Sequence, residues 1–359
     1  MDGAAPSASA RVKRLWYLLF AVVGVFHAEV LSWSSPAVLY NPFNFILTVP
    51  VYAVHYIVFG DLILRRGRCG FFVLFTFGCL TGMYEFVITK VYFVPPWDPS
   101  HGDLPFGVAW LEVLWIGFVW HALLSFYVPA RIMFEVFAPG GRGSLSPRER
   151  RLLFTLVPLA SGATGLLSGQ GLPAMFLNLG LSIAVIALVA WAFVRVAGAS
   201  AGLELRSLVL GRRGRTFAWA FLVGVYALYG FGLRPDAWKV GAPLVVMAAL
   251  YLLLIALARR FLKGPSGGLP SGAAPVPSLG PARDHFQGFV IALAVGYVAL
   301  FAALLISPIL LLIVFGLFVY GGAALGAGLL AWTSLVAWRS RQMKSARVAK
   351  PDSPVGPTP

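Results

Sequence analysis

The chain has 359 residues, of which 59% are hydrophobic and only 11% are charged, and its mean hydropathy is +0.83. Soluble domains carry about 25% charged residues, so this composition excludes a soluble globular protein. It predicts an all-α, polytopic integral membrane protein, because only lipid can replace water around so much apolar surface. The formal net charge of +15 would suit a nucleic-acid binder. The basic residues are distributed by topology instead, so we expect membrane lipids as partners and no nucleic acid.

Ten segments have the apolar length of a membrane span, which needs about 20 residues. The first of them also resembles a signal peptide, and cleavage near Ser35-Pro36-Ala37 is the alternative to a retained span. The last two are separated only by Ser307-Pro308, which predicts a tight turn or a kink. In chain order the expected spans are Leu15–Leu31, Pro42–Leu62, Gly70–Val94, Phe106–Val128, Leu152–Ser168, Pro173–Val194, Thr216–Leu233, Val240–Ala258, Phe286–Ile306 and Ile309–Trp338.

The basic residues fall on alternate loops. Of the 28 lysines and arginines, 25 lie on one side of the expected bundle, Arg234 and Lys239 lie on the other, and Lys90 lies within a span. The positive-inside rule then places both termini in the cytoplasm, most simply in the cytoplasmic membrane. The alternation holds only if Ser307-Pro308 is a true turn, so it favours ten spans over nine.

Composition divides the chain further. The segment Gly264–Ala282 is rich in Pro, Gly and Ser and predicts a flexible cytoplasmic linker. Gly322 and Gly326 are spaced for close helix packing, within this chain in preference to a dimer. The expected units are an N-terminal tail (1–14), a polar four-helix module (15–130), a basic loop (131–151), an apolar four-helix module (152–262), the linker (263–285), a C-terminal hairpin (286–338) and a basic, then disordered tail (339–359).

Ionisable residues are concentrated in the first four spans. Each costs about 2.5–3.5 kcal/mol on insertion scales unless it is paired or hydrated, so such residues indicate function. The last six spans have no ionisable residue well inside them. The residues concerned are His27, Glu29, His55, Asp61, Glu85, Lys90, Glu112 and His121.

Glu85 and Lys90 share a span but not a face. In an α-helix five residues turn about 500°, which leaves the two side chains about 140° apart. Glu85 must therefore find a partner on another helix or in water. It shares its own face with Thr81 and Thr89, and Tyr52 and His55 form a similar polar stripe on the second span.

Glu112 and His121 are nine residues apart, which places them on opposite faces of an α-helix. Only one of them can then face an outer cavity, and we expect Glu112. The candidate acid/base residues are Glu85, Glu112 and Glu29. The candidate substrate-binding residues are Lys90, His55, Tyr52, His27, Thr81, Thr89 and Trp97.

Several plainer interpretations stand beside these. Lys90 could extend to the outer headgroups, and Asp61 is expected to pair with Arg65, four residues on, at the cytoplasmic edge. His55 and His121 lie at similar depth, which is compatible with a bis-histidine haem. The outer-loop motif Asp98-x-x-His101-x-Asp103 has metal-compatible ligands. Neither pattern is specific, so the cofactor and the metal content stay open.

These features support three functional hypotheses. The first is transport of a small or amphipathic substrate through a polar site in the outer half of spans one to four. The alternative is an intramembrane enzyme acting on a lipid or lipid-linked substrate at the outer leaflet, with Lys90 holding an anionic headgroup. The third is a non-catalytic subunit of a membrane complex. Transport predicts a path through the bundle, whereas an enzyme predicts a cavity closed on the cytoplasmic side.

Overall fold

The structure is a computed structural model, and it describes residues 8–94, 105–138, 145–169, 171–198, 203–263 and 279–349. These residues form helices and no strands, which confirms the all-α class. The π-helical segments are η1, η2, η4, η5 and η6, and the 3₁₀ turns are η3, η7 and η8. In chain order the elements are α1 (Ala10–Val25), η1 (Phe26–Val30), α2 (Pro42–Arg66), α3 (Phe71–Gly82), η2 (Glu85–Thr89), η3 (Pro105–Gly107), α4 (Trp110–Glu112), η4 (Val113–Tyr127), α5 (Val128–Arg131), η5 (Ile132–Val136), α6 (Pro147–Arg151), η6 (Leu152–Leu156), α7 (Val157–Leu167), α8 (Leu172–Ala197), η7 (Leu205–Leu208), α9 (Arg212–Gly232), η8 (Pro235–Ala237), α10 (Ala242–Lys263), α11 (Leu279–Ile306) and α12 (Pro308–Ala349).

Helix α2 shows how local sequence sets the helix ends. The Asn41 side chain accepts a hydrogen bond from the Phe43 backbone N–H at 3.0 Å, and Pro42 occupies the first helical position. Both are standard ways to begin a helix, because the first N–H groups have no partner within it. Gly67 ends α2 in the left-handed region at φ 66°, where glycine is favoured.

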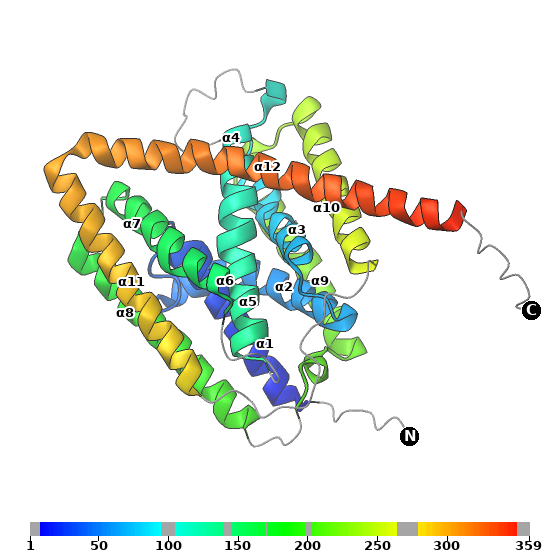
Figure 1. Cartoon of the computed structure of the whole chain (residues 1–359), viewed down its shortest axis with the longest axis horizontal. Helices are drawn as coiled ribbons and strands as arrows, with labels where there is room; N and C mark the ends of the chain where they lie inside the picture. Colours follow the sequence, from blue (N-terminus) through cyan, green and yellow to red (C-terminus); the bar gives the residue numbers. More distant parts are fainter. Residues whose placement is uncertain are drawn as a thin grey trace, which may run out of the picture.

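Four inner helical segments form the centre of the molecule (Figure 1). Helix α1 packs antiparallel on α2, and α3 packs antiparallel on η4. An outer helix covers each of them, because α8 packs on α1, α9 on α2, α10 on α3 and α12 on η4. The apolar windows of Phe71–Thr89 and Trp110–Val136 are 83% and 78% buried, against 28% for those of α8, α10 and α12. The outer helices thus present apolar surface to lipid.

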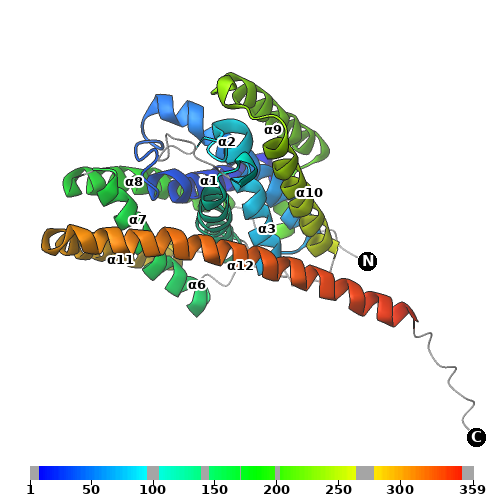
Figure 2. The same ribbon diagram turned by 90° about the horizontal axis from the view of Figure 1, so that it is seen from above.

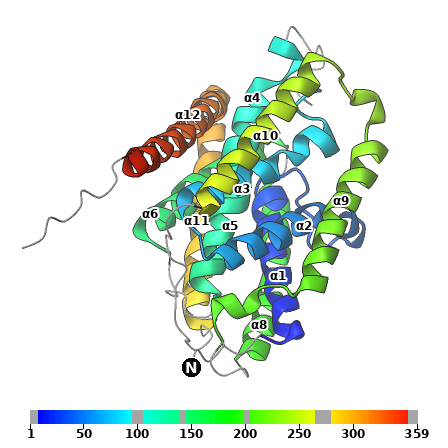
Figure 3. The same cartoon turned by 90° about the vertical axis from the view of Figure 1, so that its right-hand side faces the viewer.

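Figures 2 and 3 show the outer layer from other sides. In Figure 3, α9 and α12 lie on opposite sides of the inner helices. The chain turns sharply at Ser307 between α11 and α12 (Figure 1), as the Ser307-Pro308 pair predicts. Helix α12 then crosses η4, and a Cβ added at Gly326 would lie 2.3 Å from the Leu114 carbonyl oxygen. Packing of Gly322 and Gly326 within the chain is therefore confirmed.

Six helices among the described residues are long and apolar enough to cross a membrane. They are Pro42–Arg66, Phe71–Thr89, Trp110–Val136, Leu172–Ala197, Ala242–Lys263 and Gly316–Gln342. The other predicted spans lie on helices too, within α1 and η1, η6 and α7, α9, and α11. A multi-pass membrane protein is confirmed, and the count of ten spans stays a prediction.

The third predicted span is wrong in detail. The apolar pattern predicts one continuous helix over 70–94, but α3 ends at Gly82, π-helix η2 follows, and Lys90 leaves the helix at φ 58°. The flexible linker stays a prediction, because residues 264–278 lie outside the described part of the chain. Helix α11 begins at Leu279, so its first turn includes Pro281, a position where proline is tolerated.

Long-range contacts gather the basic segments at one end of the molecule, called here the basic end. The Lys13 ammonium donates to the Val209 carbonyl at 2.8 Å, and Arg68 donates to the Phe261 carbonyl at 3.2 Å. Asp61 pairs with Arg65 at 2.7 Å, as predicted. The loops at 31–41, 90–94 and 233–241 follow or precede the other ends of these helices, and Lys90 and Arg234 connect two of them through bonds to Leu233 and Thr89.

Glu149 anchors the basic loop at this end. Its carboxylate accepts hydrogen bonds from the Tyr127 hydroxyl at 3.1 Å and from the Arg131 guanidinium. Burial alone would raise the pKa of Glu149, but hydrogen bonds from Ser146 and the charge of Arg131 together lower it below its ordinary value. The carboxylate therefore stays ionised and holds α6 against α5.

Cysteine labelling tests the predicted orientation. Cys69 and Cys79 are both buried thiols that form no disulfide, so their replacement by Ser gives a background without thiols. We expect Lys239→Cys to react with an impermeant thiol reagent in intact cells, and Arg213→Cys to react only after permeabilisation. The reverse pattern would contradict a cytoplasmic basic end.

Candidate functional site

A cavity of about 750 Å³ lies among the inner helices in the half of the molecule opposite the basic end. Its wall includes α12, whose Tyr320 is 68% exposed, so the cavity reaches the lipid-facing surface. The lining residues are Ala28, Glu29, Ser32, Ser34, Tyr52, Tyr84, Glu85, Thr89, Val91, Leu111, Trp115, Ile116, Trp120, His121, Thr164, Gly316, Val319 and Tyr320. The volume falls within the range of small-molecule sites.

A connected series of polar contacts lies between two carboxylates in this cavity. The Tyr52 hydroxyl donates to Glu29 Oε1, and the Tyr52 and Tyr84 hydroxyls bond to each other. The Tyr84 hydroxyl lies 3.4 Å from His121 Nε2, which lies 3.1 Å from Glu85 Oε1. Five side chains from four helical segments therefore form one connected group.

The donors in this series can be assigned. An ionised carboxylate only accepts, so His121 Nε2 carries the hydrogen that faces Glu85. The Tyr52 hydrogen points to Glu29, so the hydrogen between the two tyrosines belongs to Tyr84. Tyr84 then donates to Tyr52 and Tyr52 donates to Glu29, whereas the His121 hydrogen is directed to Glu85, so the 3.4 Å contact between Tyr84 and His121 carries no hydrogen.

Each carboxylate has further donors. Ser34 donates to Glu29 Oε2 at 2.8 Å, and Thr89 donates to Glu85 Oε2. No lysine or arginine is among the lining residues. Hydrogen bonds from neutral groups thus stabilise both carboxylates, and a substrate's polar group would meet negative charge there.

Glu29, Glu85 and His121 all lie in π-helical segments, η1, η2 and η4. A π-helix bonds each N–H to the carbonyl five residues before it, which shifts the side chains relative to an α-helix. Such segments are rare and often occur at functional sites. This backbone turns the three side chains toward one cavity.

An aromatic layer closes the cavity toward the basic end. Tyr56, Phe126 and Phe20 each lie one to two turns nearer that end than the cavity residues on their own segments. The Tyr56 and Phe126 rings stack with centroids 5.6 Å apart, and Phe20 lies 4.9 Å from Tyr56. All three side chains are fully buried, and the Tyr56 hydroxyl bonds to the Ser125 carbonyl. These three rings fill the space next to the cavity on its basic-end side with apolar groups.

The family described as "Uncharacterized membrane protein family" matches residues 18–344. The chain belongs to this family. A protein of Archaeoglobus fulgidus, described as "Uncharacterized protein", is 36% identical over 121 residues, which is 34% of this chain. The matched part spans only 38% of that relative's length. No solved structure matches the chain.

The family match supports an integral membrane protein in contact with lipid, and the positions of the candidate residues refine that conclusion. Of the predicted residues, Glu29, Glu85, Tyr52 and Thr89 line the cavity. Thr81 donates to the Phe77 carbonyl, and His27 Nδ1 lies 2.8 Å from the Val23 carbonyl, outside the cavity lining. His55 lies in a different groove. Trp97 falls outside the described residues, as does the Asp98-x-x-His101-x-Asp103 motif.

The choice of Glu112 over His121 for the cavity is wrong. His121 lines the cavity and bonds to Glu85, whereas Glu112 is buried elsewhere. Because η4 is π-helical, angles taken from a regular α-helix do not identify which of the two side chains faces the cavity. Sequence analysis also missed Tyr84 and Ser34, which carry no charge to mark them.

Both interpretations of Lys90 are wrong. Its side chain is 0% exposed, so it does not extend to headgroups, and it is not among the cavity residues. Its ammonium donates to the Gly230 carbonyl at 2.7 Å and to the Leu233 carbonyl, at the C-terminal end of α9. A cation there satisfies carbonyls that the helix leaves unpaired.

The bis-histidine haem does not fit either. The Tyr84 ring lies 5.1 Å from the His121 ring and 6.4 Å from the His55 ring, in the space a macrocycle would need. Both Nε2 atoms are also engaged, His121 with Glu85 and His55 with the Tyr226 hydroxyl at 2.8 Å.

Lys90→Ala is expected to lower the free energy of unfolding by roughly 2–3 kcal/mol, because buried carbonyls lose a charged donor. Thermal unfolding of the purified protein in detergent measures this. Lys239→Ala is the matched control, since Lys239 is exposed on the neighbouring loop. Equal stability of the two variants would contradict the capping role.

Proposed function

We propose that this protein is an intramembrane enzyme that performs acid–base chemistry on an amphipathic, lipid-type substrate. The observation that carries the proposal is a pair of carboxylates, with a histidine and two tyrosines between them, in a cavity that reaches lipid. The substrate's apolar part would lie along α12, and its polar group would contact Glu85 and Glu29.

Glu85 is the proposed base, because its carboxylate lines the cavity and its conjugate acid stays in contact with the same substrate. His121 Nε2 has a single in-plane position for hydrogen, so it orients the Glu85 carboxyl group and passes no proton to Tyr84. Glu85 then returns a proton to the substrate as the acid, while Glu29, which accepts from Tyr52 and Ser34, orients the substrate's polar group. The cycle is balanced without a second reactant, since one proton leaves the substrate and one is given back.

Charge supports a substrate with a neutral or cationic polar group. The cavity holds two carboxylates and no lysine or arginine. An anionic headgroup would be repelled, and Lys90, which sequence analysis assigned to hold it, is engaged with α9. The enzyme hypothesis is kept in this changed form.

The closed aromatic layer favours an enzyme over a transporter. A transported substrate needs a path to both sides, and here Tyr56, Phe126 and Phe20 fill that path. With both termini in the cytoplasm, the cavity would face the outer leaflet of the cytoplasmic membrane.

Reconstitution tests the proposal. Purified wild type and Glu85→Gln are placed in vesicles made of lipids extracted from the native membrane, and lipid species are followed by chromatography and mass spectrometry. We expect species that change only with wild type. Movement of unchanged lipid or solute across the vesicle wall would indicate transport, and no change of either kind would indicate a non-catalytic subunit; both results contradict the proposal.

A further inference from the structure

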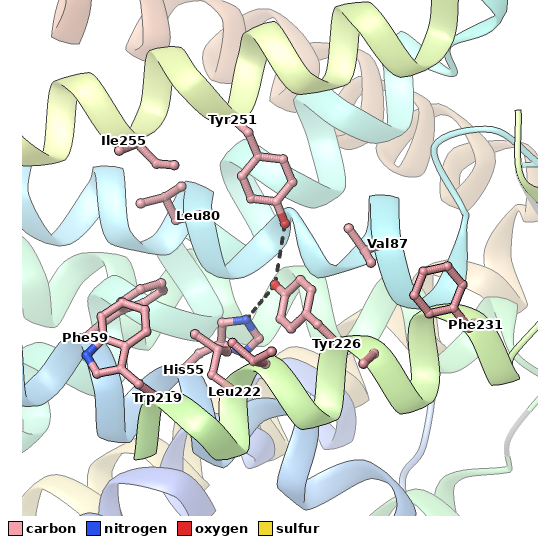
Figure 4. A pocket seen from close by; sticks show the side chains of 12 residues that line it. His55, Phe59, Leu80, Val87, Trp219, Leu222, Tyr226, Phe231, Tyr251 and Ile255 are labelled. Atoms are coloured by element: carbon pink, nitrogen blue, oxygen red, sulfur yellow. Dashed lines mark hydrogen bonds between the residues drawn. The ribbon is translucent and has the colours of Figure 1, made fainter. Parts of the chain in front are cut away.

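A second groove lies between α9 and α10, with α2 and α3 also contributing to its lining (Figure 4). Its volume is about 560 Å³, and apart from His55, Tyr226 and Tyr251 its lining is almost wholly apolar. In Figure 4 Trp219 lies toward one end of the groove and Phe231 toward the other, with the three polar residues between them. Twelve helical residues separate Trp219 from Phe231, which corresponds to about 18 Å.

The groove faces lipid. On α9, Val223 and Phe231 line it and are 65% and 75% exposed. An apolar groove in such a surface takes up hydrocarbon, because no water competes for it. A polar group in the lipid-facing surface is costly unless it is hydrogen-bonded. The hydrogen-bond pattern of the groove's polar residues therefore restricts which ligands can bind there.

The hydrogen-bond pattern of the three polar residues can be read atom by atom. His55 Nδ1 lies 2.6 Å from the Val51 carbonyl, which can only accept, so Nδ1 carries a hydrogen. Burial in an apolar surrounding favours the neutral imidazole, which leaves Nε2 as an acceptor. The Tyr226 hydroxyl, 2.8 Å away, therefore donates to Nε2.

Tyr251 has also used its hydrogen. Its hydroxyl lies 3.1 Å from the Met83 carbonyl and 3.5 Å from the Tyr226 oxygen, and the carbonyl is the shorter contact. The two tyrosine oxygens keep free lone pairs and offer no free donor. A ligand that satisfies them must bring its own donor.

We infer that this groove binds a long-chain lipid alcohol, whose hydroxyl donates to Tyr226 or Tyr251 and whose chain lies along α9. This site is separate from the cavity around Glu85 and does not depend on the acid–base proposal. A quinone or ester carbonyl fits less well, because it has no hydrogen to donate.

Photolabelling of the purified full chain tests the inference. The probe is a long-chain primary alcohol with a diazirine in its chain, and cross-linked residues are mapped by mass spectrometry. Unlabelled dodecan-1-ol and its methyl ether compete for the site. We expect labels on α9 and α10 along the groove and competition by the alcohol roughly three- to tenfold better than by the ether, as one hydrogen bond implies.

Two variants on α9 provide the steric control. Ala227 lines the groove, so Ala227→Trp should abolish the labelling, with Ala227→Leu as a milder variant that should weaken it. Leu228 is 71% exposed outside the groove lining, so Leu228→Trp should leave labelling unchanged. Equal competition by alcohol and ether, labels spread over all lipid-facing helices, or labelling that survives Ala227→Trp would each overturn the inference. A change of oligomeric state in Ala227→Trp with unchanged labelling would identify the groove as a protein interface instead.

Discussion

Glu85→Gln is expected to yield a folded protein that has lost about a hundred- to ten-thousandfold of its activity, the usual contribution of a general acid or base. The amide keeps the size of the side chain, and its oxygen can still accept from Thr89 or His121. It cannot take up a proton. The measurement is the rate of lipid conversion in reconstituted vesicles, normalised to folded protein.

Two other carboxylates serve as matched controls for this variant. Glu112 is buried but lies outside the cavity lining, so Glu112→Gln should have a smaller effect on activity. Asp61 accepts from the Leu210 backbone N–H and pairs with Arg65 at the basic end, so Asp61→Asn should have almost none. Equal activity losses in all three variants would indicate a general structural effect.

Gly78→Ala is expected to prevent α3 from packing on η4, at a cost above about 3 kcal/mol. A Cβ at this position would lie 2.4 Å from the Ala122 carbonyl oxygen and 2.6 Å from its Cα. Overpacking against a side chain costs about 1–3 kcal/mol, and a backbone cannot yield by changing rotamer. Yield and thermal unfolding in detergent measure the loss.

Gly180→Ala is the control for Gly78→Ala. Gly180 lies within α8 and nothing lies within 4 Å of an added Cβ there. Alanine is preferred to glycine in a helix by about 1 kcal/mol, so this variant should match or exceed wild-type stability. If Gly78→Ala is equally stable, α3 and η4 do not approach as described, and the position of His121 beside Glu85 would be wrong as well.

Much of the fold can be predicted from composition and charge. The apolar content indicates the membrane class, and Gly322 and Gly326 indicate a close helix crossing that the structure contains. The angle between Glu85 and Lys90 also predicts correctly that they do not pair, although the helix between them is not regular. These predictions need only local periodicity and the cost of burying charge.

The site is harder to predict, because it depends on irregular backbone. His121 reaches Glu85 through the π-helical geometry of η4, which has no marker in the residue pattern. Tyr84 lies between the two carboxylates, but in the sequence it is one aromatic residue among many, and nothing in its spacing distinguishes it. The sequence predicts that Lys90 contacts headgroups or substrate, but it bonds to Gly230 and Leu233, which lie about 140 residues further along the chain. Long-range contacts of this kind do not follow from spacing.

Thiol accessibility shows whether the cavity opens away from the basic end and is closed toward it. Ser32→Cys places a thiol in the cavity, in the background lacking Cys69 and Cys79, and leaves Glu85 and His121 unchanged. A small charged thiol reagent is applied to oriented vesicles from either side, with Arg213→Cys and Lys239→Cys marking the two faces. We expect Ser32→Cys to react from the Lys239 side alone, whatever substrate or ion gradient is present. Reaction from the Arg213 side would show a path through the aromatic layer and would contradict a cavity closed toward the basic end.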